Sequence, residues 1–92
     1  MAGKEQRTLK DSCVRIAMNA MLSRKCANTF QDRKVVAHND GDYDLVDLLS
    51  RQITFCKAEE QAYENALDIL ADHCPELVNR ARYLWSDDNE KV

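Results

Sequence analysis

The scarcity of glycine and proline constrains this chain more than any other feature of its sequence. Its 92 residues include only two glycines and one proline. Folds built from many strands need many turns, and turns draw on Gly, Pro and Asn. Few turns imply a few long elements, and the apolar residues recur at the three- and four-residue steps of a helix. We therefore predict an all-α fold, a compact antiparallel bundle of five to six helices.

Apolar spacing and cap residues set the boundaries that we expect for these helices. The expected helices cover about 8–25, 42–56, 58–73 and 75–85, with one or two short helical turns within 26–41. The turn signal Asn39-Asp40-Gly41 precedes a helix that Asp42 or Asp44 can cap. Pro75 suits the first position of the last helix. We predict a single helical domain over 1–85, followed by a polar tail, 86–92.

The expected redox state of the four cysteines follows from the compartment that the sequence suggests. No run of about 18 apolar residues is present, which argues against a transmembrane helix. The first residues lack the apolar core of a secretory signal. We therefore expect the cytosol, or the nucleus by diffusion, where thiols stay reduced. Cys13, Cys56 and Cys74 fall within or at the ends of apolar stripes, as small core residues do, whereas Cys26 does not.

No constellation of side chains predicts catalysis or a metal. The chain has no C-x-x-C or H-x(3–5)-H pair, the usual signal of structural zinc. A calcium loop starting at Asp40 fails, because Leu45 stands where Gly is needed and Arg51 where Glu is needed. A thiol nucleophile beside His38 or His73 would need free backbone N–H groups, which a Gly-poor helical bundle lacks. We expect no enzymatic activity, no metal and no cofactor.

Charge is unevenly divided along the chain. Residues 1–34 carry eight Lys or Arg against three acids, and residues 35–92 carry five against thirteen, although the net charge is only −3. Such asymmetry suggests charged partners, unless the two halves match each other within one fold. The candidate basic side of an interface is Arg15, Arg24, Lys25, Arg33 and Lys34. The candidate acidic side is Asp40, Asp42, Asp44 and Asp47.

The stretch from Asp42 to Leu84 resembles the second half of a caspase-recruitment domain, a member of the death-fold family. The matching residues are Leu45, Leu48 and Leu49, then Ala62, Tyr63, Ala66, Leu67 and Leu70, and finally Pro75-Glu76-Leu77. The resemblance covers about half of the chain and implies a bundle of six helices. It also implies homotypic assembly, with Arg15, Arg24 and Lys25 of one copy against Asp40, Asp42, Asp44 and Asp47 of another.

The predicted function is that of a non-enzymatic intracellular interaction module, an adaptor or regulator that binds a protein partner or another copy of itself. Contact between two different patches would be heterologous and would build rings or filaments. One alternative is a small viral or regulatory protein that docks on one host protein. Another is a nucleic-acid-binding regulator that uses its basic N-terminal half, against which the sequence pI of about 5.3 counts. No membrane partner is expected.

Overall fold

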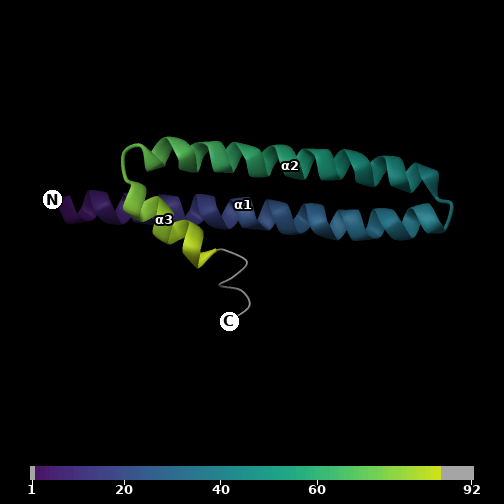
Figure 1. The fold of residues 1–92 in the computed structure, drawn as a ribbon, viewed down its shortest axis with the longest axis horizontal. Helices are drawn as coiled ribbons and strands as arrows, with labels where there is room; N and C mark the ends of the chain where they lie inside the picture. Colours follow the sequence, from purple (N-terminus) through teal and green to yellow (C-terminus); the bar gives the residue numbers. More distant parts are fainter. Residues whose placement is uncertain (1, 86–92) are drawn as a thin grey trace.

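Three helices make up the part of the chain that the structure describes. The computed structural model describes the backbone of residues 2–85 and the side chains of residues 8–85. Helix α1 spans Ala2–Asn39, α2 spans Tyr43–Ala71 and α3 spans Pro75–Leu84. The first two run antiparallel as a hairpin in a molecule 60 Å long, and α3 crosses α1 near the N-terminal end of the chain (Figure 1).

The all-α prediction is confirmed, but the predicted bundle of five to six helices is wrong. The described residues form three helices and no strand. The interruption expected within 26–41 is absent before Asn39, because α1 runs through it. A break was also expected near residues 57–58, but α2 continues through them without interruption. The molecule is therefore a long hairpin with a short third helix, and the predicted tail 86–92 lies outside the described residues.

Helix α1 continues through residues that resemble a helix start. Thr29 is of a residue type that often caps helices, but its side chain donates from Oγ1 to the carbonyl oxygen of Lys25 at 3.1 Å. A threonine inside a helix bonds back to the preceding turn in this way, and the residue then needs no cap role. Ser50 and Thr54 on α2 do the same. Hydroxyl residues thus mark helix interior here and not helix ends.

The turn between α1 and α2 confirms the predicted loop and cap. Gly41 has a φ of 76°, the left-handed region that favours glycine. Its N–H donates to the His38 carbonyl at 3.1 Å, and the Asp42 N–H donates to the Ala37 carbonyl at 2.9 Å. These two bonds close α1 with a Schellman motif. The Asp42 carboxylate then accepts from the Leu45 N–H at 3.2 Å and caps α2.

The turn between α2 and α3 also follows its sequence signal. Pro75 occupies the start of α3, where its missing N–H costs nothing. The Cys74 N–H donates to the Leu70 carbonyl at 2.8 Å, and the Cys74 thiol donates to the same oxygen at 3.3 Å. The chain therefore reverses sharply at Cys74, and α3 folds back onto the hairpin.

Helices α1 and α2 pack along a seam that repeats every seven residues. On α1, buried or half-buried residues alternate in steps of three and four: Cys13, Ile16, Ala20, Ser23, Ala27, Phe30, Lys34 and Ala37. The matching series on α2 and the turn after it is Val46, Leu49, Ile53, Cys56, Glu60, Tyr63, Leu67, Leu70 and Cys74. This 3.5-residue period is that of a two-stranded coiled coil. Mostly small side chains on α1 meet larger ones on α2, so the two helices can lie close together.

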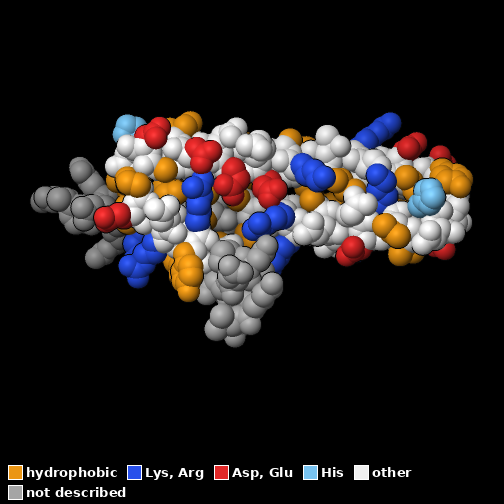
Figure 2. Space-filling view, viewed as in Figure 1, with side chains coloured by type: hydrophobic (Ala, Val, Ile, Leu, Met, Phe, Trp, Pro, Cys, Tyr) orange, Lys and Arg blue, Asp and Glu red, His pale blue; other side chains and the backbone are white. Residues whose placement is uncertain are grey.

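Ion pairs link neighbouring helices beside the seam. Nη2 of Arg82 lies 2.7 Å from Oδ1 of Asp68 and 3.4 Å from Oε2 of Glu64. Further along the hairpin, Nε of Arg24 lies 3.8 Å from Oε2 of Glu60. Figure 2 shows the result on this side of the molecule, where acidic side chains follow α2 and basic side chains stand beside them. All five side chains are partly exposed, so each pair contributes modestly to stability.

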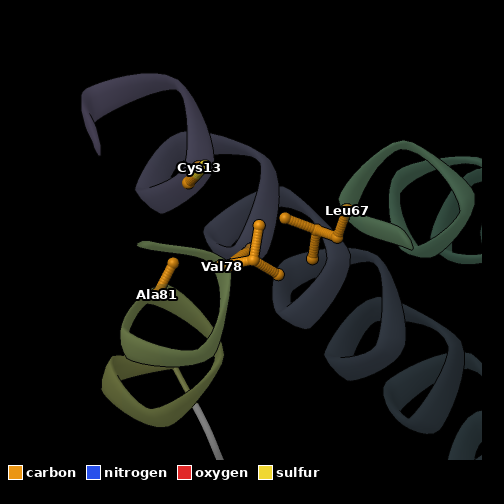
Figure 3. Close-up of a cluster of buried hydrophobic side chains, with 5 residues drawn as sticks. Cys13, Leu67, Val78 and Ala81 are labelled. Carbon is orange, nitrogen blue, oxygen red and sulfur yellow. The ribbon is translucent and has the colours of Figure 1, made fainter. Parts of the chain in front are cut away.

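A cluster of buried side chains forms where all three helices meet. It consists of Cys13, Ala17, Leu67, Val78 and Ala81. In Figure 3, Val78 and Ala81 of α3 lie against α1, and Leu67 enters from α2. Leu67, Val78 and Ala81 are each 0% exposed, so water is excluded from these side chains. Burial of these apolar side chains is the main favourable term that fixes α3 in place.

We expect Leu67→Ala to lower the free energy of unfolding by about 2–4 kcal/mol, since it leaves a cavity at the junction of three helices. Val35→Ala, at a 52% exposed side chain of α1, should cost less than about 1 kcal/mol. Urea denaturation followed by circular dichroism measures both. Equal losses for the two variants would contradict this account of the core.

Arg82→Gln should lower the free energy of unfolding by about 0.5–1 kcal/mol at low salt, because it removes the charge that Asp68 and Glu64 share. The loss should shrink at high salt, where exposed charges are screened. Arg80→Gln is the matched control on α3, because exposed Arg80 forms no ion pair with a described residue. A salt-independent loss for Arg82→Gln would contradict the electrostatic explanation.

Candidate interaction face

The hairpin has two long sides, and α3 covers part of only one. On the covered side, a cavity of about 210 Å³ lies between α1 and α3. It is lined by Ala17, Met21 and Arg24 of α1 and by Arg82 of α3 and Trp85 at its end. Among the described residues, the depressions on the other side of the seam are lined by α1, α2 and their turn, and not by α3. We call that other side the open face.

The open face is defined by two stripes at alternating steps of three and four residues, which keep to one side of a helix. On α1 the stripe is Arg15, Asn19, Leu22, Cys26, Thr29, Arg33, Val36 and Asp40. On α2 and its cap the stripe is Asp42, Leu45, Leu49, Gln52, Cys56, Glu59 and Tyr63. A second row lies beside that stripe on α2, three residues further along the helix. We call it the outer row and include it in the open face; it consists of Leu48, Phe55, Ala62 and Ile69.

The open face carries most of the exposed large apolar side chains of the hairpin. Six of the eleven such residues in the described chain belong to it: Leu22, Val36, Leu45, Leu48, Phe55 and Ile69. Their exposed fractions range from 40% for Leu45 to 64% for Ile69. Single apolar residues are ordinary on a protein surface, but the gathering of six of them along one side of the hairpin makes that side the candidate interaction site.

Two grooves lie in line on the open face. The first, of about 470 Å³, lies at the loop end, with Val36, Leu45 and Leu49 as its apolar walls. The second, of about 220 Å³, lies nearer the middle of the hairpin and includes Leu22, Cys26, Cys56 and Tyr63. Both are shallow depressions between α1 and α2, of the kind that a side chain from another helix fills when helices pack.

The predicted basic residues do not gather on one surface. Arg24 pairs with Glu60 on the side of α3, and exposed Lys25 follows it on α1. Lys34 is half-buried at the seam, and Arg33 lines the loop-end groove. Arg15 is exposed on the open face, toward the other end of the hairpin.

The predicted acidic residues do lie together, at the loop end. Asp40 and Asp42 line the same groove as Arg33, so the structure brings one predicted base among the predicted acids of its own chain. Asp44 and Asp47 are exposed on the first turns of α2. The loop end of the hairpin is therefore acidic, and the separation of bases from acids is only partial.

The apolar part of the open face was not predicted from the sequence. Helical spacing alone does not separate Leu48 from Leu49 or Ile69 from Leu70, but the structure exposes 53% of Leu48 and 64% of Ile69. The seam, which repeats every 3.5 residues, includes Leu49 and Leu70. Their neighbours Leu48 and Ile69 therefore lie outside it. The signal that could have found them is the spacing of Leu48, Phe55, Ala62 and Ile69 at intervals of seven, a second apolar stripe on one helix.

The cysteines behave as three core residues and one surface residue. Cys13 and Cys56 are buried, Cys74 is half-buried and Cys26 is exposed, and all four are free thiols. Burial raises the pKa of Cys56, and the neighbouring Cys26 and Glu59 raise it further. Burial also raises the pKa of Cys13, with Cys74 as the neighbour that adds to the shift.

The described residues include no cluster of three or more His, Cys, Asp or Glu side chains that could hold a metal ion. Among them, no helix combines the length and apolar character that crossing a membrane requires. Comparison of the chain with protein-family models, curated proteins and solved structures found no match.

Proposed function

We propose that this chain is a non-enzymatic interaction module that pairs with a second copy of itself through the open face. The observation that carries the proposal is the stripe of exposed Leu48, Phe55 and Ile69 on α2, opposite Leu22 and Val36 on α1. A hairpin with an apolar second side is half of a four-helix arrangement, and another hairpin of the same kind completes it.

The length of the open face suits such a contact. A stable interface buries about 800 Å² on each partner. The open face runs along a molecule that is 60 Å long, and two long helices contribute to it. Exposed Phe55, near its middle, is the kind of aromatic side chain that dominates binding energy when another surface covers it.

Charge favours an antiparallel arrangement of the two copies. Arg15 lies at one end of the open face, whereas Asp40, Asp42 and Asp44 lie at the loop end, where Arg33 offsets one negative charge. A two-fold axis across the rod sets Arg15 of each copy against the acids of the other. A parallel arrangement would set the two acidic ends together. Charge complementarity of this kind fixes the orientation of partners more than their affinity.

This arrangement changes how the predicted basic and acidic residues would assemble. A two-fold contact is isologous and closes at a dimer, so it does not propagate into filaments. Arg24, already paired with Glu60 on the other side, takes no part in it. The homotypic assembly implied by the caspase-recruitment resemblance stays a prediction, and here it takes the form of a closed dimer through Arg15.

The open face disfavours nucleic acid as the occupant. Its bases are interleaved with acids, as with Arg33 beside Asp40 and Asp42, so they form no continuous positive track for phosphates. A salt-dependent mobility shift with a labelled duplex or RNA would support the nucleic-acid alternative instead. A different protein partner is the remaining alternative, and the variants below distinguish it from a second copy.

We expect the wild type to form a dimer whose population rises with concentration, measured by light scattering coupled to gel filtration. Phe55→Glu should weaken the dimer by about 2 kcal/mol or more, roughly thirtyfold in Kd, because it buries a charge at the centre of the contact. Val35→Glu is the matched control, because this exposed apolar residue of α1 lies two heptads beyond Met21 on the side of α3.

A wild type that remains monomeric at every concentration would overturn pairing with a second copy. Dissociation by Val35→Glu, with Phe55→Glu still dimeric, would move the interface to the other side of the hairpin. Circular dichroism of each variant establishes that the helices remain folded.

Arg15→Glu should weaken the dimer at low salt, and a second change, Asp40→Arg, should recover part of the loss. The expected coupling between the two changes is about 0.5–1 kcal/mol, and it should fall at high salt. Lys25→Glu is the control, since Lys25 is not part of the open-face stripes. Strictly additive losses for Arg15→Glu and Asp40→Arg would rule out the antiparallel charge match.

A further inference from the structure

The four cysteines lie as two pairs across the hairpin. Cys26 of α1 and Cys56 of α2 line the same groove on the open face. Cys74, at the start of α3, packs against the buried cluster that contains Cys13 of α1. In the sequence, Cys26 and Cys56 both lie between Cys13 and Cys74. This order is the one that an antiparallel hairpin requires.

Only this pairing of the four cysteines is compatible with the fold. Cys13 and Cys26 are separated by about 20 Å along α1, at 1.5 Å per residue. Cys56 lies about 22 Å from the end of α2 at Ala71, and Cys74 lies beyond that end. A disulfide requires Cα atoms about 4.4–6.8 Å apart. The same axial separations exclude Cys13 with Cys56 and Cys26 with Cys74. Of the three connectivities that four cysteines allow, the hairpin leaves one.

The two pairs differ in their access to reagents. Cys26 is exposed, whereas Cys56 is only 7% exposed, so the groove offers one accessible thiol with a second behind it. Cys13 is 0% exposed and sits within the cluster that fixes α3. Burial, with the adjacent thiol, also raises the pKa of Cys56, which leaves less of this cysteine as the attacking thiolate.

We propose that Cys26 and Cys56 form a reversible disulfide that links α1 to α2, by exchange with a small disulfide of the glutathione type. This proposal stands independently of dimer formation. The Cys26 thiolate attacks one sulfur of oxidised glutathione, and a glutathione thiolate leaves. The Cys56 thiolate then attacks the Cys26 sulfur of the mixed disulfide, and the second glutathione thiolate leaves. The two protons released by the cysteines pass to the departing thiolates, so two protein thiols are oxidised and one disulfide is reduced.

The site of this link matches the part of the hairpin that lacks a third helix. The cluster with α3 seals the end near Cys13, whereas the loop end beyond Cys26 depends on the two-helix seam alone. A bond between Cys26 and Cys56 closes a loop that contains the α1–α2 turn and reduces the freedom of the unfolded chain. It would therefore hold the loop end closed.

The test exposes the full chain, at a low concentration that separates copies, to buffers of increasing oxidised-to-reduced glutathione ratio. Digestion without reduction and mass spectrometry then identify the linked peptides. We expect the Cys26–Cys56 peptide first, with Cys13 and Cys74 still reduced. The linked protein should melt about 10 °C or more above the reduced protein, and added dithiothreitol should reverse the shift.

Cys56→Ala tests the order of the steps, because it should trap glutathione on Cys26 without a crosslink. Cys26→Ser should abolish both the glutathione adduct and the melting shift. Cys74→Ser should leave the reaction of Cys26 with glutathione and the melting shift unchanged. Glutathione on Cys26 of the wild type without an intramolecular link would overturn the proposal. Formation of the Cys13–Cys74 link first would overturn it equally, since the order of access would be reversed.

Discussion

The seven-residue repeat shared by α1 and α2 is the constraint on which the rest of the structure depends. Small side chains such as Ala20, Ala27 and Ala37 recur on α1, while α2 supplies larger ones such as Leu49 and Ile53. Small residues against large ones let two helices interdigitate over their whole shared length. A hairpin joined by a short turn with Gly41 in its left-handed conformation then keeps this register. The open face and the pairing of the cysteines both follow from it.

The sequence predicted what local chemistry determines. The few glycines implied helices, the Asn39–Gly41 signal gave the turn, Asp42 gave a cap and Pro75 gave the start of the last helix. Each of these features acts within a few residues, so no knowledge of the partner helix was needed. The position of the loop end, and hence of its acidic residues, was predictable for the same reason.

The sequence failed to predict what the packing of two helices decides. An interruption was expected within 26–41, but a long seam stabilises α1 up to Asn39, and the Thr29 hydroxyl bonds back to Lys25. Leu48 looked as suitable for the core as Leu49, because both are leucines on one predicted helix. Only the register against α1 decides that Leu49 is buried and Leu48 is not. The ion pair of Arg24 likewise depended on which α2 residue lies opposite.

The loop end of the hairpin lies away from the cluster with α3, and the two proposed interactions would both support it at one place. In the proposed dimer, a second copy on the open face would remove Leu48 and Phe55 from water, and this support would depend on protein concentration. The proposed Cys26–Cys56 disulfide would reduce the entropy of the unfolded chain, and this support would depend on the redox poise. The groove with these thiols belongs to the same face, so a bound copy would also shield Cys26 from a small disulfide. The proposed pairing would therefore slow oxidation, and the disulfide would form most readily in the dilute chain, which lacks a second copy.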